Sequence, residues 1–395
     1  MNKYLQINNF RNYDIVRIDM NNHDVFVLYG KNGEGKTNVL EAISMFSGGK
    51  GLRHSKLDDM IRYDNSNFWN ITISLEDGIF SSGYIKKEKV SRRIYKVSDK
   101  NVRNLSEFSK GYYILWMTYE TDRLFMMSPS DRRNFIDMFC CSRFFDHQKN
   151  ITDYEKLTRE RLKILRQVFD NNNHNNKEYL YKWLSIIESK IVENGINIAN
   201  TRMDICREIE DGQYYDSDFP IFKNFMEGDI ERLIISSREN NNNNDSEGLK
   251  KCYVEELLRR REKDYFSNST TFGPNRSDWK VFHQKNQMYA NFCSAGEQKM
   301  ILLGVFLSFI KQNLSHDQRT LILLLDDVIA HLDFDHRVLL FKHIKKIRKS
   351  FEDACVRNLI FLTGTDKNLF QELISENVLF LNVKENNIFE DTSEI

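Results

Sequence analysis

The stretch that decides the fold is Gly30-Lys31-Asn32-Gly33-Glu34-Gly35-Lys36-Thr37. It fits the pattern of a phosphate-binding loop, in which a glycine is followed by four residues and then Gly-Lys-Ser/Thr. An apolar run, Val25–Leu28, precedes it, and helix-spaced apolar residues follow from about Thr37 to Phe46. Glycines let backbone N–H groups turn toward a phosphate, and the helix N-terminus adds its positive dipole end. The sequence therefore predicts a P-loop between a strand and a helix.

Each part of this loop has a predicted role toward ATP. The whole segment from Gly30 to Thr37 is predicted to bind the phosphates through its backbone. The Lys36 ammonium should reach the β- and γ-phosphates, and the Thr37 hydroxyl should ligate Mg²⁺. A P-loop alone does not distinguish a kinase, a GTPase and an ABC-type ATPase, so the second half of the chain has to decide.

The apolar run Leu321–Leu325 predicts a central parallel strand, and it ends in Asp326-Asp327. This is the form of a Walker B strand. Asp326 is predicted to hold Mg²⁺, and Asp327 is the predicted catalytic carboxylate that orients or deprotonates the attacking water. The alternative is a strand that happens to end in an acidic turn.

A helix-opening segment, Ser294-Ala295-Gly296-Glu297-Gln298-Lys299, lies just upstream. Ser294 with Glu297 also fits an ordinary capping box, which is the alternative interpretation. In ABC-type heads such a signature binds the γ-phosphate of ATP held by a second subunit. Ser294 and Gly296 are therefore predicted ATP contacts, and Ser294 is predicted to take part in catalysis with Lys36.

Two further segments follow in the order that ABC-type heads require. Ala330-His331-Leu332-Asp333 fits a D-loop, which makes Asp333 a predicted ATP contact. Phe361–Asp366 lies where a switch region should follow the next strand. Four elements in this order favour an ABC-type head much more strongly than any one of them.

The chain is predicted to be an α/β ABC-ATPase/SMC-like P-loop head with an inserted, short α-helical arm. Alternation between residues 69 and 102 predicts an antiparallel β meander, and helical patterns dominate residues 131–170, 178–210 and 248–266. Ser294 comes 257 positions after Thr37. Transporter ATPases place the signature much closer to the P-loop. The predicted head is residues 1–120 and 270–395, with the helical arm at 121–269.

Bulk composition narrows the class of protein. Of 395 residues, 41% are hydrophobic and 29% charged, which is typical of a packed globular chain, and the net charge is zero. This argues against a protein held to nucleic acid by bulk charge alone, but it does not exclude a local basic surface. The six cysteines lack metal-ligand spacing, and no targeting or membrane segment is visible. We expect reduced thiols in the cytoplasm and no structural zinc.

At this level the chain resembles the RecF family of DNA repair proteins over nearly its whole length. The similar segments are residues 9–13, 38–43, 48–53, 116–124, 131–137, 154–157 and 273–278, together with the P-loop, signature, Walker B and D-loop segments. Asn275 departs from the family, which usually has histidine there. Glu120 occupies the place of a Q-loop glutamine, either as a Mg²⁺ or water contact or as a plain surface residue.

The resemblance implies a mechanism. ATP would join two heads into a homodimer that clamps double-stranded DNA and single-strand/double-strand junctions at gaps. With RecO and RecR, the dimer would promote loading of RecA and induction of the SOS response. Faster ABC ATPases carry glutamate where this chain has Asp327, so the resemblance implies a weak, DNA-stimulated ATPase whose hydrolysis releases the dimer.

DNA contacts are predicted in the basic stretch of the meander, at Lys86, Lys87, Lys89, Arg92 and Arg93. Further basic runs are Arg259–Arg261 and Lys342–Lys349. Solvated strand and helix faces are the alternative for all of them. Arg132 and Arg133 fit salt bridges at the base of the arm equally well, and Arg53 is placed to approach the nucleotide.

Other classes of protein remain open. An OLD-type nuclease or a Rad50-like protein would need a carboxylate-rich metal domain or long arms, and a transporter or translation ATPase would need an early signature. Another SMC-like or ABC-type P-loop ATPase is an alternative. So is an ATP-binding DNA scaffold whose site does not hydrolyse ATP.

Overall fold

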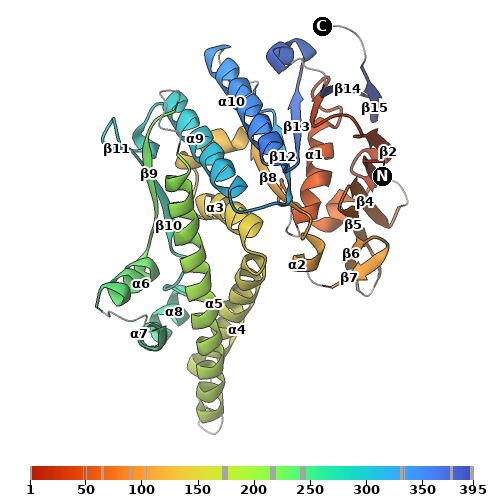
Figure 1. Cartoon of the computed structure of the whole chain (residues 1–395). Helices are drawn as coiled ribbons and strands as arrows, with labels where there is room; N and C mark the ends of the chain where they lie inside the picture. The colour runs from red at the N-terminus through yellow and green to blue at the C-terminus, as the bar shows by residue number, and fades with distance from the viewer. Residues whose placement is uncertain are drawn as a thin grey trace. The chain divides into compact units, whose positions relative to one another are not determined.

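The computed structural model of the chain describes residues 2–47, 49, 51–63, 66–88, 90–103, 105–170, 177–213, 219–240, 246–329, 332, 334–373 and 377–391. Its packing divides the chain into two compact units. The first unit is Met1–Asp122 with Asn313–Ile395, and the second is Arg123–Gln312. Figure 1 shows their elements.

The first unit contains a six-stranded sheet in the order β15-β14-β3-β13-β12-β8. Its strands are β8 (Tyr112–Thr118), β12 (Thr320–Asp326), β13 (Asn358–Gly364), β3 (Val25–Tyr29), β14 (Val378–Lys384) and β15 (Asn387–Glu390). All pairs are parallel except β14 with β15. Every residue of β12 and β13 is buried, which explains their unbroken apolar runs. The carboxyl ends of β3, β13 and β12 therefore lie beside one another.

A second six-stranded sheet, in the order β2-β1-β4-β5-β6-β7, is antiparallel throughout. Its strands are β1 (Tyr4–Phe10), β2 (Tyr13–Asp19), β4 (Phe68–Leu75), β5 (Gly78–Ile85), β6 (Arg92–Val97) and β7 (Lys100–Val102). Helix α1 (Lys36–Ser44) contacts β1 of this sheet and both β12 and β13 of the other. The predicted meander is present, and α1 buries its apolar side chains against both sheets.

Short helical turns and one long helix complete the first unit. They are η1 (Met45–Ser47), η2 (Leu57–Met60), α2 (Leu105–Phe108), α10 (Phe334–Asp353) and η6 (Lys367–Leu373). The core of this unit is rich in aromatic rings: Phe26 and Phe361 stack on neighbouring strands with ring centres 4.7 Å apart. This stacking fixes β3 beside β13, where the P-loop begins.

The second unit is mainly helical. Its elements include α3 (Pro129–Arg143), α4 (His147–Asp170), α5 (Lys177–Asp211), α6 (Asp229–Asn240), α7 (Ser246–Arg259), α8 (Arg261–Ser267) and η5 (Ala290–Phe292). Helix α9 (Ala295–Leu314) begins in this unit, and η3 (Tyr119–Met126) leads into it. The long helices α4 and α5 lie side by side (Figure 1).

A three-stranded sheet in this unit was not predicted. It contains β9 (Phe222–Glu227), β10 (Asp278–His283) and β11 (Met288–Tyr289), paired in the order β11-β10-β9. Strand β9 is only six residues long and lies between helices, so its local sequence carries little strand signal. Its partner β10 comes more than fifty positions later, so no local periodicity could reveal the pairing.

The packing units differ from the predicted domains for one segment. The first division, after Asp122, lies two positions from the predicted boundary at residue 120. Residues 270–312, however, pack within the second unit. The reason is that β10 pairs with β9, while Phe306 and Phe309 of α9 contact Phe139 of α3. The assignment of functional domains stays a prediction.

A buried ion network holds the helices of the second unit together. Arg161 on α4 donates to Glu188 on α5 over 2.9 Å and to Asp264 on α8 over 2.6 Å, and none of the three is exposed. Arg261 adds a second contact to Glu188, 2.5 Å long. Because a buried charge is costly unless it is paired, these contacts specify which helix faces meet.

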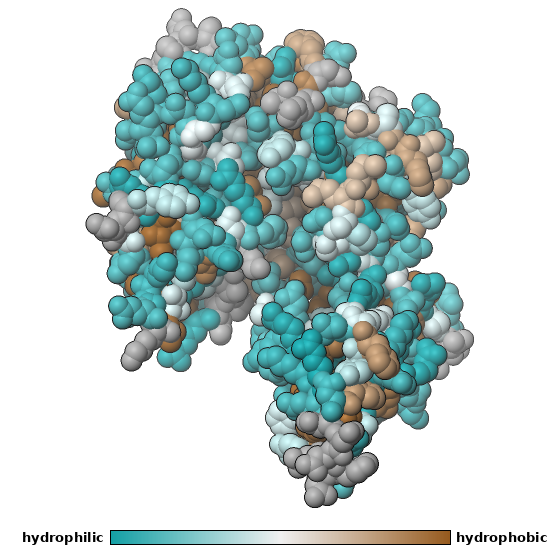
Figure 2. All heavy atoms as spheres, turned by 180° about the vertical axis from the view of Figure 1, so that it is seen from behind, coloured by the Kyte–Doolittle hydropathy of each residue, from teal (hydrophilic) through white to brown (hydrophobic). Residues whose placement is uncertain are grey.

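The surface shown in Figure 2 is mainly hydrophilic, with hydrophobic residues in small separate groups. In the part of the chain that the structure describes, no helix combines the length and apolarity needed to span a bilayer.

Candidate nucleotide site and signature segment

The P-loop connects β3 to α1 through glycines with positive φ angles. Gly30, Gly33 and Gly35 have φ of 151°, 88° and 105°. A side chain at Gly30 would overlap the backbone carbonyl of Val383, so glycine is required there by space as well as by conformation. The Lys36 ammonium donates to the carbonyl oxygens of Gly30 and Lys31 over 2.7 and 2.8 Å. The loop therefore curls around the lysine at the start of α1.

Asp326, at the end of β12, meets two hydroxyl groups from neighbouring elements. Thr37 on α1 donates to Asp326 Oδ1 over 2.9 Å, and Thr363 on β13 donates to the same oxygen over 2.8 Å. Thr363 also accepts the backbone N–H of Asp327 at 2.8 Å. The parallel order of β3, β13 and β12 brings these residues together from three distant parts of the sequence.

Charge and burial act against each other in this site. Burial lowers the pKa of Lys36, while the nearby carboxylates of Asp327 and Asp326 act to raise it. Burial raises the pKa of Asp326, and the hydrogen bonds from Thr363 and Thr37 only partly offset this. The site therefore holds a cation and two carboxylates, with Asp326 almost without water around it.

Asp327 follows β12 in a turn conformation. Its φ of 54° lies in the left-handed region, which aspartate and asparagine adopt more readily than other residues with a side chain. Its Oδ1 is buried and has no hydrogen-bond partner among the described residues. Asp327 lines a pocket together with Lys36, Thr37, Arg53 and Thr363. Asp327 thus lines the pocket in which the sequence predicts the nucleotide.

The segment Asn9–Tyr13 supports the P-loop, a role that sequence reasoning missed. Asn12 donates to the Glu34 carbonyl over 3.3 Å and accepts from the Asn38 side chain over 2.7 Å, while the Tyr13 hydroxyl donates to the Gly35 carbonyl over 3.1 Å. The Arg11 guanidinium forms a bidentate salt bridge with the carboxylate of Glu41 on α1, through hydrogen bonds of 2.9 and 2.7 Å. Residues 9–13 belong to the segments that resemble the RecF family. Their contact with the P-loop could not be predicted, because the P-loop residues they bind lie more than twenty positions later in the sequence.

Arg53 and Glu120 are the two other residues that the sequence predicts near the nucleotide. Arg53 lines the pocket and donates to Asn38 over 2.9 Å. Glu120 is exposed and accepts a hydrogen bond from Tyr119 over 3.2 Å. The role of Glu120 as a Q-loop residue stays a prediction.

Ser294 and Glu297 form a complete capping box at the start of α9. The Glu297 carboxylate accepts from the Ser294 backbone N–H over 2.9 Å and from its hydroxyl over 2.8 Å, and the Glu297 N–H donates to the Ser294 hydroxyl over 3.4 Å. Asn286 fixes the other Glu297 oxygen over 2.6 Å. Ser294 itself is exposed, and the surroundings of Gly296 are open to a distance of 4 Å. The same residues thus cap the helix and leave its N-terminus accessible.

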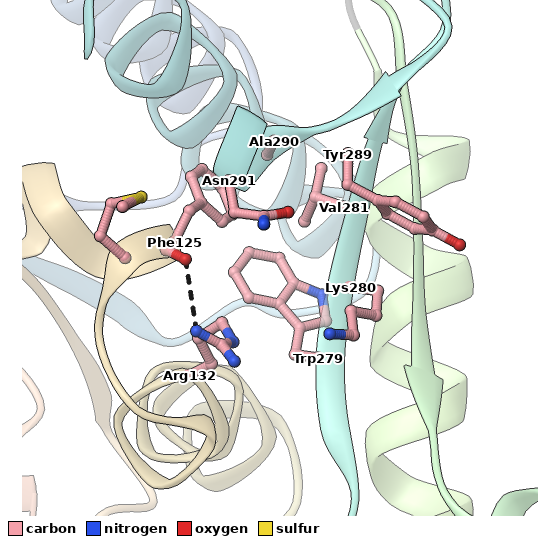
Figure 3. A pocket seen from close by; sticks show the side chains of 9 residues that line it. Phe125, Arg132, Trp279, Lys280, Val281, Tyr289, Ala290 and Asn291 are labelled. Atoms are coloured by element: carbon pink, nitrogen blue, oxygen red, sulfur yellow. Dashed lines mark hydrogen bonds between the residues drawn. The ribbon is translucent and has the colours of Figure 1, made fainter. Parts of the chain in front are cut away.

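A pocket lies next to this helix start, within the second unit (Figure 3). The residues that line it include Phe125, Arg132, Trp279, Tyr289 and Asn291. Its rim carries unusually exposed apolar side chains, since Met126 is 67% exposed and the adjacent Phe292 is 72% exposed. Arg132 is held by Asp278 over 2.7 Å, as predicted for a salt bridge, and Arg133 donates to the Ser277 carbonyl over 2.7 Å.

The predicted DNA contacts have different environments. Lys86, Lys87 and Arg92 are exposed, whereas Lys89 lies outside the described residues. Arg93 differs, because its guanidinium donates to the carbonyls of Gly49 and Met45 over 2.5 and 2.6 Å and packs over the Tyr95 ring. Burial lowers the pKa of Arg93. The geometry therefore favours a packing role for Arg93 over a phosphate contact.

The other basic runs and the D-loop can be placed in part. Arg259 and Arg260 both pair with Glu256, and Arg261 pairs with Glu188. These arginines are thus occupied by carboxylates. Of the D-loop, Ala330, His331 and Asp333 lie outside the described residues, so the predicted ATP contact of Asp333 stays a prediction.

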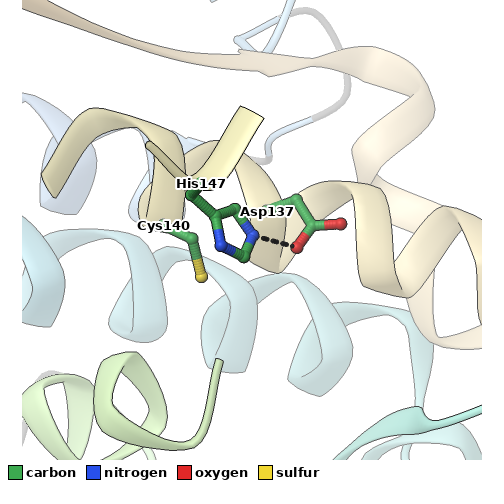
Figure 4. A group of neighbouring side chains, drawn as sticks. All are labelled: Asp137, Cys140 and His147. Carbon is green, nitrogen blue, oxygen red and sulfur yellow. Dashed lines mark hydrogen bonds and ion pairs between the residues drawn. The ribbon is translucent and has the colours of Figure 1, made fainter. Parts of the chain in front are cut away.

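Asp137, Cys140 and His147 gather three possible metal-ligand atoms (Figure 4). However, Arg202 donates to both oxygens of Asp137 over 2.8 and 2.7 Å, and His147 contacts one of them at 2.8 Å. A guanidinium on both oxygens leaves little room for a divalent cation. Burial alone would raise the pKa of Asp137, but the charge of Arg202 and these hydrogen bonds hold it well below its usual value. The group is explained as an anchor between helices.

Comparison with known proteins gives the family. A family model described as an AAA domain matches residues 4–387. The DNA replication and repair protein RecF of Rickettsia prowazekii is 33% identical over 84% of this chain and 88% of its own length, and that of Rickettsia typhi is equally similar. The chain belongs to the RecF family.

The fold agrees with this assignment. Two solved structures of the recombination mediator protein RecF in the RecFOR pathway, described as RecF-ATPrS and RecF-ATP, superpose with TM-scores of 0.79 and 0.77. They share 19% and 18% sequence identity with this chain, cover 99% of it, and are themselves covered over 98% and 97% of their length. The predicted fold class, an ABC-type P-loop head of the SMC kind, is confirmed.

Proposed function

We propose that this chain is an ATP-switched DNA-binding protein of recombinational repair and replication restart, as its family membership indicates. The observation that carries the ATP part is the meeting of Thr37, Thr363 and Asp326 at the carboxyl end of β12, beside a glycine-rich loop that opens a helix. In α/β sheets, ligands bind at this edge of the strands, and anions bind at helix N-termini.

The site residues have the following proposed roles. The backbone of residues 30–37 and the Lys36 ammonium bind the triphosphate, and the Thr37 hydroxyl with the Asp326 carboxylate provides oxygen ligands for Mg²⁺. The ion would neutralise charge on the β- and γ-phosphates. The fit rests on two oxygens of the right type lying 2.9 Å apart at the end of the P-loop.

A second copy of the chain completes the proposed site. Ser294 and Gly296 lie at an accessible helix N-terminus of the second unit, while the P-loop belongs to the first unit. Each copy would offer its signature to the nucleotide of the other, with Asp333 of the D-loop nearby. ATP would then act as an interfacial ligand, so that dimer stability depends on the γ-phosphate.

Hydrolysis would reverse this switch. Asp327 is the proposed catalytic carboxylate, because it lines the pocket and its Oδ1 has no hydrogen-bond partner among the described residues. Aspartate is shorter than the glutamate of faster ABC ATPases, which supports weak, DNA-stimulated turnover. Release of phosphate would let the two heads separate.

DNA and protein partners follow from the family. The dimer would hold double-stranded DNA and single-strand/double-strand junctions, with exposed Lys86, Lys87 and Arg92 as contacts together with Lys89. RecO and RecR would act with it to load RecA and to induce the SOS response, in the cytoplasm.

Light scattering with and without ATP-Mg²⁺ tests the clamp, using the wild type, Lys36→Met and Ser294→Arg. ATP should convert the wild type into a dimer, and both substitutions should prevent this. Ser294→Arg should still bind ATP as a monomer, because its own P-loop is intact. If the wild type binds ATP but stays monomeric, or Ser294→Arg dimerises normally, the shared site is wrong and an ordinary P-loop ATPase is the better account.

A further inference from the structure

Helix α4 (His147–Asp170) carries a line of basic side chains. The members are Lys149, Lys156, Arg159, Lys163 and Arg166, and all five are exposed. Their spacings of seven, three, four and three residues place them on one face, because three and four residues are close to one helical turn. We call these five residues the α4 basic face.

The α4 basic face is opposite the side on which the helix packs. The buried residues of α4 include Tyr154, Arg161, Ile164, Leu165 and Val168. At 100° per residue these cluster about half a turn away from the basic residues. The basic side chains therefore point toward solvent, and their positions are set by the packing of α4 against α5.

The five cations are not engaged by carboxylates. Within the described ranges, none of them forms an ion pair with another residue. The contacts they do make are neutral: Arg159 donates to the Glu155 carbonyl over 3.1 Å and Arg166 to the Asn268 side chain over 2.5 Å. This contrasts with Arg259, Arg260 and Arg261, which all pair with carboxylates. Glu155 and Glu160 border the face but form no ion pair with it at the distances described.

The dimensions of the face fit a nucleic-acid backbone. From Lys149 to Arg166 the helix rises by roughly 25 Å, at about 1.5 Å per residue. Phosphates recur every ~3.4 Å along the axis of each duplex strand. A row of long cations of this length can reach several phosphates of a duplex, and phosphate contacts carry no sequence information directly. The net charge of the chain is zero, so this local excess would direct where DNA lies.

We propose that the α4 basic face binds the phosphate backbone of double-stranded DNA. The proposal rests on the DNA binding proposed above. It adds a surface whose contacts are with phosphates and are independent of base sequence.

The test measures the affinity for a fluorescent duplex in the presence of ATP-Mg²⁺, between ~50 and ~200 mM salt. The variant is Lys156→Gln/Lys163→Gln, which removes two cations near the middle of the face. Each lost phosphate contact should reduce the slope of log K against log salt by about 0.9. The variant should therefore lose a slope of about 2 for each copy of α4 that contacts the duplex, and its affinity should fall roughly tenfold per lost contact near 0.1 M salt.

A matched control removes the same charge elsewhere in the second unit. Lys250→Gln/Lys251→Gln changes two exposed lysines of α7 (Ser246–Arg259). It should leave the salt slope within about 0.5 of the wild type. In the opposite direction, Glu155→Gln/Glu160→Gln should strengthen binding, because it removes the acidic borders of the face. Both double variants of α4 should still dimerise with ATP, which shows that they are folded.

The outcomes separate this inference from the proposed function. A slope loss confined to Lys156→Gln/Lys163→Gln, with tighter binding after Glu155→Gln/Glu160→Gln, supports the α4 basic face. If the wild type binds DNA and the α4 variant keeps its slope, or the α7 control loses as much, the face is not the DNA surface although the clamp stands. If the wild type with ATP does not bind duplex DNA at all, the proposed function itself fails.

Discussion

Asp326 is nearly buried and accepts hydrogen bonds from Thr37 and Thr363 on the same oxygen. Its folded-state pKa is raised by burial, so its ionised form is less favourable in the folded protein than in the unfolded chain. At neutral pH this lowers stability, and the cost would be relieved by a bound cation. The ionised carboxylate of Asp326 is therefore less favourable in the folded protein when no cation is bound beside it.

Asp326→Asn should therefore raise the melting temperature of the protein without nucleotide, since it keeps the size of the side chain and removes the charge. Each kcal/mol of relief corresponds to roughly 2–4 °C for a unit of this size. ATP hydrolysis should fall by about 100-fold or more, because the Mg²⁺ ligand is lost. Calorimetry and a phosphate-release assay measure the two effects.

The pH dependence provides the control for Asp326→Asn. The folded pKa of Asp326 is raised, so the penalty is present above that pKa and disappears below the unfolded value of about 3.9. The difference in melting temperature between variant and wild type should shrink as the pH falls toward that value. A lower melting temperature for Asp326→Asn at pH 7 contradicts this account.

At the scale of elements, Asp137 joins α3 to α5 and to the start of α4. It lies on α3, its partner Arg202 lies on α5, and His147 is the first residue of α4. Arg202 also donates to the Pro274 carbonyl over 2.7 Å, which ties the segment before β10 to the same point. One carboxylate therefore fixes three helices, and its ionisation matters for their packing.

Asp137→Asn should destabilise the second unit by about 3–5 kcal/mol at neutral pH, because it leaves the Arg202 charge buried without its partner. The folded pKa of Asp137 is lowered, so its stabilising contribution is present above the unfolded value of about 3.9 and is lost as the pH falls through the folded value. The gap between wild type and variant should accordingly close only below about pH 4.

Denaturant unfolding at pH 7 and pH 3 measures this gap. The matched control is Asp204→Asn, which changes an exposed carboxylate of α5 that pairs with Arg207 three residues on. Its effect should stay within about 0.5 kcal/mol. If Asp137→Asn costs no more than this control, the Asp137 anchor does not hold the helices.

For the whole molecule, the proposed dimer requires that the surface around Ser294 forms part of the interface between the two copies. Phe292 lies two positions before Ser294, so their Cα atoms are at most about 7 Å apart. If Ser294 meets a nucleotide on a second copy, the exposed Phe292 ring has to enter the interface. Large exposed apolar groups of this kind are typical of binding surfaces.

Phe292→Ser should weaken ATP-driven dimerisation by about 2 kcal/mol, or roughly 30-fold in the dimer dissociation constant. Binding of ATP to the monomer should not change. Phe266→Ser is the matched control, because Phe266 on α8 is 75% exposed, close to the 72% of Phe292. Sedimentation at several protein concentrations gives the constants. If both variants dimerise equally well, Phe292 is not part of the dimer interface.

The α/β head, the P-loop strand and helix, and the strand that ends at Asp326 could all be predicted from the amino-acid sequence. These features are local: a buried parallel strand needs an unbroken apolar run, and a P-loop needs its glycines between a strand and a helix. The family resemblance also came from the sequence, because it depends on residue identities in order.

The tertiary structure decided which polar residues meet. Thr37, Asp326 and Thr363 come together only because β12 and β13 lie next to β3 in one sheet, and Asn12 and Tyr13 reach the P-loop from another sheet. It also paired β9 with β10 across more than fifty positions. It placed the Arg93 guanidinium against backbone carbonyls, whereas the cations of the α4 basic face are exposed. The physical reason is that charge pairing and strand pairing depend on distance in space, whereas a sequence pattern reports only the periodicity of its own element.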